Sequence, residues 1–224
     1  MVKVLIFGNK KESIEKLVKK SGFQVVNESP QFVISYGGDG TLMRAEHNFP
    51  NIPKIILKDS HICKKCPPLS NEEILLKVKN GDYKIEKLLK LEAQAKGKTL
   101  IGMNDIIVHN KDPRHAIRYR VIINDKNTNR EIIGDGIIAA TPFGSTGYYR
   151  SITDSYFEIG IGLAFNNSTE QSDHVILKDS SIIKMSIVRG PALVYADNQE
   201  DFIELNDGDN VLVKKSEEYA QIII

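Results

Sequence analysis

Short apolar runs and stretches with helical spacing follow one another along the first third of the chain. The runs Val2–Phe7, Gln31–Tyr36 and Lys54–Lys58 are apolar enough to predict buried parallel strands. Between them, Asn9–Lys20 and Thr41–Asn48 carry apolar residues at the spacing of one helix face. This order of strands and helices favours a mostly parallel sheet with helices on its faces.

The helical spacing nearly vanishes in the rest of the chain. Its last clear sign is the pair Ser70 and Glu73, which have the spacing of a helix-capping box. Further on, Ala116–Val121 alternates apolar and polar residues with the period of a strand. Turn signals recur at Asn124-Asp125, Asp135-Gly136, Asn166-Asn167 and Asp207-Gly208. We therefore expect a Rossmann-like α/β domain in residues 1–85 and a β-rich, sandwich-type domain in residues 86–224.

The composition is that of an ordinary globular protein: of 224 residues, 41% are hydrophobic and 26% are charged. The balance of 30 Lys and Arg against 29 Asp and Glu argues against dedicated nucleic-acid binding. No apolar run approaches the ~20 residues of a membrane span, and charge interrupts the N-terminus too soon for a secretory signal. Cys63 and Cys66 are the only cysteines, which suits the reducing cytoplasm. We expect a cytoplasmic enzyme or small-ligand binder.

The first candidate for chemistry is the run Gly37-Gly38-Asp39-Gly40-Thr41, between a predicted strand and a predicted helix. Glycines let backbone amides approach a phosphate closely, and the N-terminus of a helix favours an anion. Anion binding alone would not favour a carboxylate here, because a phosphate repels it. Three roles are therefore open for Asp39. It can act as a base for an attacking hydroxyl, bind a metal near the phosphates, or serve as the N-cap of the helix.

Two later segments carry polar groups suited to a nucleotide. Asn104-Asp105 stands in an apolar stretch that predicts a strand, so at most one of the two side chains is expected to face a given pocket. An amide and a carboxylate suit the recognition of hydroxyl groups, although a strand end that caps its own backbone has the same composition. The run Thr141–Tyr148 is rich in hydroxyls and glycine. Taken alone it favours an ordinary turn, as does Asp135 between its two glycines.

Three motifs in one order along the chain resemble the NAD kinase family. Tyr36–Thr41 is similar to its GGDGT signature, which the diacylglycerol and sphingosine kinases and their phosphofructokinase relatives share. Gly102–Ile107 is similar to its Asn-Glu segment. Gly134–Gly136 and Thr141–Tyr148 resemble its GDG and TPxGSTxY motifs. The likeness implies the fold of that family, an α/β domain followed by a β-rich domain, in a short and divergent member.

For catalysis, the resemblance implies that Asp39 is the general base acting on the adenosine 2′-hydroxyl of NAD. The residues whose backbone would hold phosphates are Gly37, Gly38, Gly40 and Thr41. The implied activity is the transfer of a phosphoryl group from ATP to NAD, which gives NADP and depends mainly on positioning and charge neutralisation. Magnesium (Mg2+) would arrive with ATP and bridge its phosphates, and the sequence offers no dedicated metal cage.

The resemblance also implies where NAD binds. Asn104 and Asp105 would bind its ribose hydroxyls. The other residues that would line the NAD site are Thr146, Gly147, Tyr148, Ser151 and Asp197. Asp135 would approach the substrate of a neighbouring subunit, because the family assembles as homodimers and homotetramers. These expectations place the active site between the two domains, where ligands often bind.

Two other functions fit part of the sequence. A lipid kinase of the diacylglycerol or sphingosine type would share Gly37–Thr41 but would leave Thr141–Tyr148 unexplained, and nothing in the chain resembles a membrane-binding face. A non-catalytic or altered-specificity nucleotide-binding protein would keep the pocket without turnover. The best support for that second alternative is the run Leu57–Cys66, which is basic and has no glycine where the family usually has a glycine-containing stretch.

The run Leu57–Cys66 is basic and has two interpretations. Its residues with metal-binding or redox chemistry are His61, Cys63 and Cys66. They supply half of a zinc site, to be completed by another subunit, or a redox pair. We favour a basic loop whose lysines neutralise phosphates, Lys58, Lys64 and Lys65. The histidines that stand in no ligand pattern, and for which we expect structural or surface roles, are His109, His115 and His174.

Overall fold

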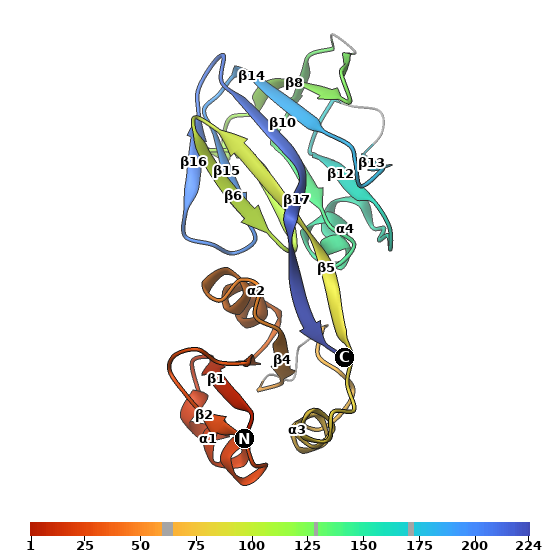
Figure 1. The fold of residues 1–224 in the computed structure, drawn as a ribbon. Coiled ribbons are helices and arrows are strands. Elements are labelled where there is room, and N and C mark those ends of the chain that lie inside the picture. The colour runs from red at the N-terminus through yellow and green to blue at the C-terminus, as the bar shows by residue number, and fades with distance from the viewer. Residues whose placement is uncertain (60–64, 128–129, 170–172) are drawn as a thin grey trace. The chain divides into compact units, whose positions relative to one another are not determined.

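The computed structural model of the protein describes four stretches of the chain, residues 1–59, 65–127, 130–169 and 173–224. They form two compact units, the first made of residues 1–88 and 219–224 and the second of residues 89–218 (Figure 1). The chain passes between the units twice, within the strands β5 (Ile85–Ala95) and β17 (Asn210–Ile223). The predicted zinc half-site or basic loop falls largely outside the described residues, since these do not include His61, Cys63 and Lys64.

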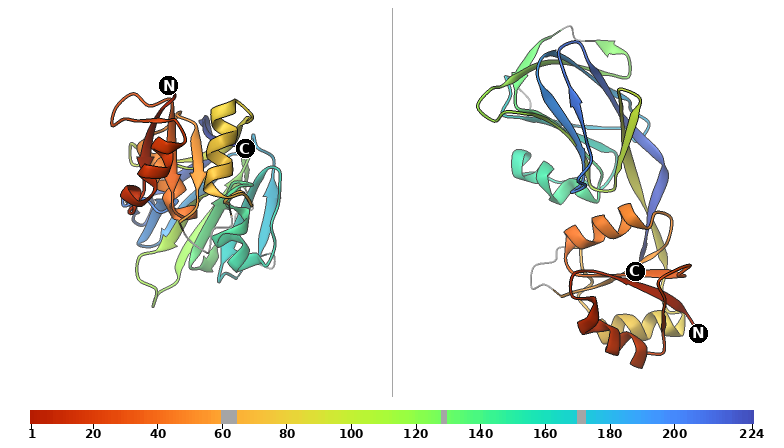
Figure 2. Two further views of the ribbon diagram at one scale, coloured as in Figure 1. Left: turned by 90° about the horizontal axis from the view of Figure 1, so that it is seen from below. Right: turned by 90° about the vertical axis from the view of Figure 1, so that its left-hand side faces the viewer.

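The first unit is a parallel sheet with helices on both faces, as the sequence predicts. Its strands are, in spatial order, the end of β17, β4 (Lys54–Leu57), β3 (Phe32–Tyr36), β1 (Lys3–Phe7) and β2 (Gln24–Val25). Their pairings are parallel. Figure 2 shows α2 (Asp39–Asn48) on one face of this sheet and both α1 (Lys11–Lys20) and α3 (Asn71–Asn80) on the other.

Burial explains this arrangement. Strands β1, β3 and β4 each contribute side chains with no exposed surface, such as Val4, Ile34 and Ile55. Strands covered on both faces are expected to be continuously apolar, as these runs are. Helix α1 turns Ile14 and Val18 toward the sheet and leaves its charged residues in solvent.

The second unit is a sandwich of two sheets whose described pairings are antiparallel. One sheet contains β5, β6 (Lys98–Gly102), β8 (Ile117–Ile123), β9 (Lys126–Asn127), β10 (Ile132–Gly134), β14 (Ile183–Arg189) and β17. The other contains, in spatial order, β13 (His174–Leu177), β12 (Ile161–Asn166), β11 (Gly136–Ala140), β7 (Asp105–Asn110), β15 (Ala192–Ala196) and β16 (Phe202–Leu205). Apolar side chains from both sheets form one buried core. The predicted fold class, an α/β half followed by a β-rich half, is confirmed.

A short helix, α4 (Tyr148–Thr153), covers the outer face of the second sheet. It follows a 3₁₀ turn at Gly144–Thr146 and packs Tyr149 against Ile138 of β11. The neighbouring Ile137 faces the other way, into the core between the sheets. The sequence predicts only a loop here, because six residues are too few to show a helical period.

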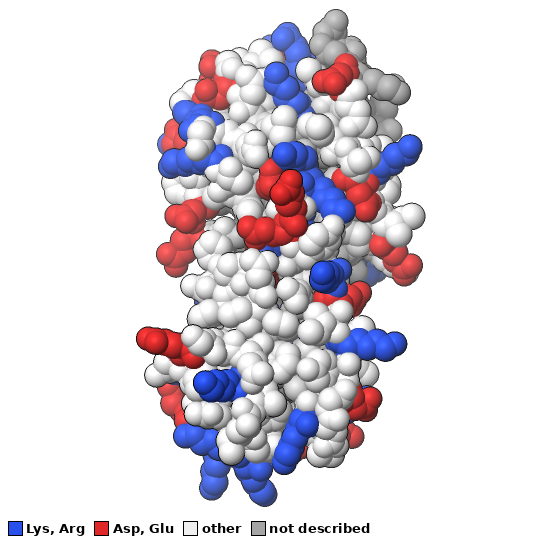
Figure 3. All heavy atoms as spheres, in the orientation of Figure 1, with Lys and Arg blue, Asp and Glu red and all other residues white. Residues whose placement is uncertain are grey.

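Charges of both signs are distributed over the surface. On the face drawn in Figure 3, Lys and Arg side chains stand beside Asp and Glu side chains over both units. This distribution agrees with a formal charge of only +1. Among the helices of the described residues, none combines the length and the apolar character that a bilayer crossing demands.

Candidate functional site

The glycine turn of the first unit joins the end of β3 to the start of α2. Gly38 is the N-cap of α2, and its carbonyl accepts hydrogen bonds from the backbone N–H groups of Thr41 (2.9 Å) and Leu42 (3.2 Å). Asp39 is therefore the first residue of the helix rather than its cap, and α2 begins before the predicted Thr41. A side chain at Gly37 would put its Cβ 2.3 Å from Thr41 Oγ1, so this close turn favours glycine.

The Asp39 side chain meets the segment that follows β4. Its Oδ1 accepts a hydrogen bond from the backbone N–H of Lys65 at 3.1 Å, and Cys66 Sγ lies 3.9 Å from the carbonyl oxygen of Gly37. These contacts place the start of the described segment 65–127 against the glycine turn. A carboxylate in the first turn of a helix also interacts favourably with the helix dipole.

The carboxyl ends of β1, β3 and β4 meet beside the glycine turn, the edge at which parallel sheets bind ligands. There the Tyr36 hydroxyl donates to Asp59 Oδ1 at 3.1 Å, and Lys10 Nζ lies 3.0 Å from Asp59 Oδ2. The hydrogen bond from Lys10, together with that from Tyr36, holds the pKa of Asp59 below its usual value. Sequence analysis identified neither Lys10 nor Asp59, although both follow closely on apolar strands.

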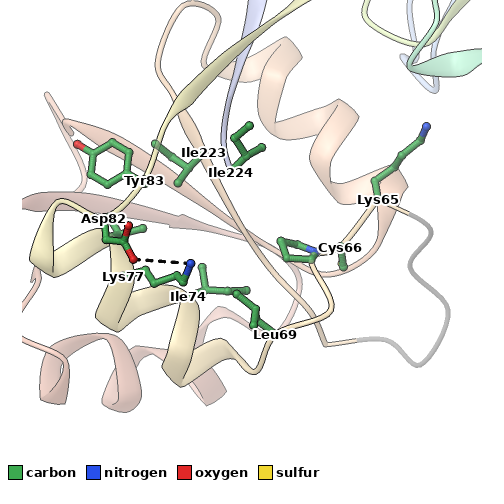
Figure 4. A pocket seen from close by; sticks show the side chains of 11 residues that line it. Lys65, Cys66, Leu69, Ile74, Lys77, Asp82, Tyr83, Ile223 and Ile224 are labelled. Carbon is green, nitrogen blue, oxygen red and sulfur yellow. Dashed lines mark ion pairs between the residues drawn. The ribbon is translucent and has the colours of Figure 1, made fainter. Parts of the chain in front are cut away.

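The first unit also contains an apolar pocket with a volume of about 300 Å³. It lies between α3 and the end of β17, and Ile74 and Ile223 line it (Figure 4). Its polar side chains include Lys77 and Asp82, which pair with each other at 3.7 Å. Phosphates need several hydrogen-bond donors directed at them. The backbone of the glycine turn therefore suits a nucleotide better than the apolar lining of this pocket does.

In the second unit, the turn before β7 is held by Asp197. Its Oδ1 accepts hydrogen bonds from the backbone N–H groups of Asn104 (2.7 Å) and Asp105 (3.0 Å), and its Oδ2 accepts one from Met103 (2.9 Å). Burial raises the pKa of Asp197, and these three hydrogen bonds oppose that rise by stabilising the charged carboxylate. Asp197 therefore fixes the shape of this turn, a role that sequence analysis did not assign to it.

Asp105 is a buried carboxyl group at the start of β7, with 3% of its surface exposed. Asn104 Nδ2 donates to its Oδ2 at 3.1 Å. Burial, and then the charge of Asp197, raise the pKa of Asp105 from 3.8 to about 7. Asn104 belongs to the turn rather than to the strand. The strand alternation behind the expectation that at most one of the two side chains faces a given pocket therefore does not apply to this pair, whose side chains meet.

The raised pKa of Asp105 predicts a pH-dependent stability. The folded state favours the protonated carboxyl, so folding carries no penalty below pH 3.8, and the penalty grows until the pH exceeds about 7. Asp105→Asn keeps the shape of the side chain but cannot ionise. We expect the variant to become progressively more stable relative to the wild type across this pH range. Urea unfolding of both proteins at either end of the range measures the difference, and parallel pH profiles would contradict the prediction.

The run Thr141–Tyr148 begins by packing on the turn that Asp197 holds. Thr141 is fully buried, and its Oγ1 donates to the carbonyl of Met103 at 2.7 Å and accepts from the backbone N–H of Gly144 at 3.0 Å. A Cβ at Gly144 would lie 1.9 Å from the carbonyl oxygen of Asn104. The two backbones thus touch at a position that only glycine can occupy.

Helix α4 and the turn before it carry the remaining predicted residues of this region. Thr146 ends the 3₁₀ turn, Gly147 is the N-cap of α4 and Tyr148 is its first residue. Ser151 Oγ donates to the carbonyl of Tyr148 at 2.7 Å, so its hydroxyl bonds to the helix itself. Gly147 and Ser151 are exposed, whereas Tyr148 is half-buried.

Asp135 lies at the corner between β10 and β11, where the chain passes from one sheet of the sandwich to the other. Asn110 Nδ2 and Asn167 Nδ2 donate to its two carboxylate oxygens, each at 3.1 Å. The next residue, Gly136, has a φ of +133°, and a Cβ there would lie 1.9 Å from the carbonyl oxygen of Val108. The Gly-Asp-Gly run is thus a corner that requires glycine, with its carboxylate held by two amides.

Tyr148 faces this corner on the outer side of the second sheet. Its hydroxyl accepts a hydrogen bond from Asn166 Nδ2 at 3.2 Å. Burial, and then the charges of Asp135 and Asp105, raise the pKa of Tyr148. The second unit therefore gathers the predicted Asn104, Asp105, Asp135 and Tyr148 around one outer surface, while the predicted residues 37–41 form the glycine turn of the first unit.

Two further residues border this surface, Asn166 and His109, whose Nδ2 and Nε2 atoms are 3.3 Å apart. The contacts of the His109 ring agree with the structural role expected for it, whereas the sequence marks Asn166 only as part of a turn signal. The available clue was spacing: His109 follows Asp105 by four positions in one strand, which places both on the same face.

Comparisons with known proteins agree with the fold and with the motifs. A family model described as the ATP-NAD kinase C-terminal domain matches residues 103–224. An NAD kinase of Saccharolobus islandicus (strain M.14.25 / Kamchatka #1) is 35% identical over 146 residues, which cover 64% of this chain and 57% of that protein. A bifunctional NADP phosphatase/NAD kinase of Methanocaldococcus jannaschii is 29% identical over 205 residues, which cover 85% of this chain and 35% of that protein. The chain thus spans little more than half the length of the first relative.

Two solved structures share the fold. A yeast NADH kinase complexed with NADH matches with a TM-score of 0.86 and 17% identity, over 100% of this chain and 83% of the other. An NAD kinase from Archaeoglobus fulgidus in complex with ATP matches with a TM-score of 0.80 and 20% identity, over 99% of this chain and 93% of the other. At such identities the likeness establishes the architecture of the chain.

Proposed function

The chain belongs to the NAD kinase family, and we propose that it transfers the γ-phosphoryl group of ATP to the adenosine 2′-hydroxyl of NAD, which gives NADP. The observation that carries this proposal is the position of Asp39. Its carboxylate lies in the first turn of α2, directly after the close turn of Gly37 and Gly38. A base at the point where phosphates are expected to bind is what a kinase acting on a hydroxyl group requires.

In this proposal, Asp39 takes the proton of the 2′-hydroxyl as that oxygen attacks the γ-phosphorus. The bond from the γ-phosphorus to the bridging oxygen of ATP breaks, and ADP leaves. The backbone that would hold the phosphates belongs to Gly37, Gly38, Gly40 and Thr41. This region lies at the N-terminus of α2, whose dipole favours negative charge.

The second unit would bind NAD. Asn104 and Asp105 offer an amide and a carboxyl group to the ribose hydroxyls, and the Tyr148 ring can stack on a base. Further residues proposed for this surface are Thr146, Gly147, Ser151 and Asp135. Asp197 would contribute by fixing the turn of Asn104, since its oxygens already accept three backbone hydrogen bonds.

Magnesium is proposed to arrive with ATP and to neutralise its phosphates. Within the described residues, no three or more His, Cys, Asp or Glu side chains come together in a way that could hold a metal ion by themselves. We therefore assign no step to a metal held by the protein alone. The proposal also keeps the cytoplasm as the compartment and a homodimer or homotetramer as the assembly, with Asp135 directed at the substrate of a neighbouring subunit.

The test is the formation of NADP from NAD, ATP and magnesium by the purified protein, detected with an NADP-specific dehydrogenase. We expect NADP to accumulate in proportion to the enzyme concentration. Parallel reactions with inorganic polyphosphate as donor and with NADH as acceptor define the range of substrates. Tight NAD binding without product would instead identify a non-catalytic nucleotide-binding protein, and phosphorylation of diacylglycerol or sphingosine without NAD binding would identify a lipid kinase.

A further inference from the structure

His109 and Asn166 meet across an intervening strand because the residue between them has no side chain. In the second sheet, Gly136 of β11 pairs with His109 of β7 on one side and with Asn166 of β12 on the other. The three residues therefore form a row across the sheet. The side chains of its two ends approach each other over Gly136, to 3.3 Å between His109 Nε2 and Asn166 Nδ2.

The hydrogen bonds of the His109 ring define its protonation pattern. Nδ1 lies 3.1 Å from the carbonyl oxygen of Asn110. A carbonyl only accepts hydrogen bonds, so Nδ1 must carry a proton. In the neutral ring Nε2 is then an acceptor, and it must receive a hydrogen from its neighbour Asn166.

This requirement fixes the orientation of the Asn166 amide. The group that faces His109 has to be the NH₂ group, because a carbonyl oxygen there would confront the lone pair of Nε2. The same nitrogen lies 3.2 Å from the Tyr148 hydroxyl and donates its second hydrogen to that oxygen. The Tyr148 hydroxyl is thus an acceptor on its protein side.

An accepting Tyr148 hydroxyl keeps its own proton for another partner. Burial, and then the carboxylates of Asp135 and Asp105, raise the pKa of Tyr148, so the proton stays on the hydroxyl at neutral pH. Tyr148 is half-buried, so part of its side chain is accessible at the surface of the second sheet, where its O–H can meet a ligand. It is therefore available to donate to a ligand bound there.

We propose that His109 is a positioning residue, which through Asn166 holds the Tyr148 hydroxyl with its hydrogen directed at the bound dinucleotide. This inference rests on the proposed function for the identity of the ligand. The arrangement of the three side chains rests only on their contacts and on the pairing of the three strands. In the reverse orientation, with the Asn166 carbonyl toward Tyr148, the hydroxyl would donate to the protein and offer only lone pairs to NAD.

The first test needs no substrate. Nitrogen-15 NMR of the imidazole of the wild-type protein near neutral pH reports which ring nitrogen carries the proton. We expect Nδ1 of His109 to be protonated and Nε2 to be bare. A proton on Nε2 instead would overturn the inference, whether or not the protein phosphorylates NAD. A wild-type protein that makes no NADP would overturn the proposed function while this measurement still decides the role of His109.

The second test separates positioning from structure. His109→Phe keeps a ring but removes the acceptor, and His109→Gln can offer an acceptor near the position of Nε2. We expect His109→Phe to raise the KM for NAD by about tenfold, the value of one hydrogen bond to a polar ligand, with kcat little changed. His109→Gln should restore a KM near that of the wild type.

The decisive control is the same substitution in a protein that lacks the hydroxyl. We expect the double variant Tyr148→Phe with His109→Phe to have the same KM for NAD as Tyr148→Phe alone, because His109 affects NAD binding only through the Tyr148 hydroxyl. An equal further rise in that background would show that His109 supports the sheet in general and would overturn the proposal. Asn206→Asp tests whether any substitution in the second unit alters the KM for NAD. Asn206 lies in an exposed turn of that unit, and its substitution should leave the KM unchanged.

Discussion

Asp39→Asn is expected to lower the rate of NADP formation by about 10²–10⁴-fold, the contribution typical of a general base. The amide has nearly the same shape as the carboxylate but cannot take the proton of the 2′-hydroxyl. Its oxygen can still accept the hydrogen bond that Lys65 donates to Asp39 Oδ1. The glycine turn should therefore keep its shape, and the loss should appear in kcat, with NAD binding measured by calorimetry little changed.

Asp82→Asn is the matched control for this experiment. Asp82 belongs to the same unit, its side chain is 74% exposed and its partner is Lys77. Its substitution removes one negative charge from the unit, as Asp39→Asn does, and should leave the rate near that of the wild type. If Asp39→Asn also stayed within a few-fold of the wild-type rate, another group would have to take the proton and the proposed mechanism would be wrong.

Glu46→Ala is expected to reduce the free energy of unfolding by about 3–5 kcal/mol, the usual result of removing one partner from a buried ion pair. Glu46 of α2 pairs with Lys54 at the start of β4, and their exposed fractions are 2% and 1%. Lys54 Nζ also donates to the carbonyl of Phe49 at 2.5 Å. Without Glu46, the Lys54 ammonium would remain buried without its carboxylate, which is the costly part. Urea unfolding followed by circular dichroism measures the loss.

Two further variants identify the cause. In Glu46→Leu with Lys54→Met, both charges are replaced by apolar groups of similar size, and most of the stability should return. Glu15→Ala removes the carboxylate of an exposed pair in α1, which Glu15 forms with Lys19 at 2.6 Å. That change should cost less than about 1 kcal/mol. If Glu15→Ala and Glu46→Ala reduced the free energy of unfolding equally, the burial of the Glu46–Lys54 pair would not account for the loss.

Local signals along the chain predict much of the fold. The capping box of Ser70 and Glu73 is formed as expected, with the Glu73 backbone N–H donating to Ser70 Oγ at 3.2 Å. The change from helical spacing to alternation marks the start of the β-rich half. The resemblance to the NAD kinase family is confirmed by the match of residues 103–224 to its C-terminal domain. These features depend on neighbours a few positions apart, which a single sequence shows directly.

What could not be predicted depends on contacts between distant segments. Asp197 looked like one more pocket residue, because nothing near it shows that its oxygens accept hydrogen bonds from residues about ninety positions earlier. The meeting of His109 and Asn166 requires the register of three strands, in which Gly136 is paired with both residues. The return of residues 219–224 to the first unit likewise has no local signal, since an apolar strand can join either sheet.

The buried hydroxyl of Thr141 has a consequence for how this surface tolerates change. Its bonds to Met103 and Gly144 tie together two turns that the chain separates by the strands β7 to β11. The contact between the two turns is therefore direct and does not pass through β8, β9 and β10, which belong to the other sheet. Insertions or deletions at the turn between β8 and β9 can accumulate among relatives without changing the surface that Asn104 and Tyr148 share.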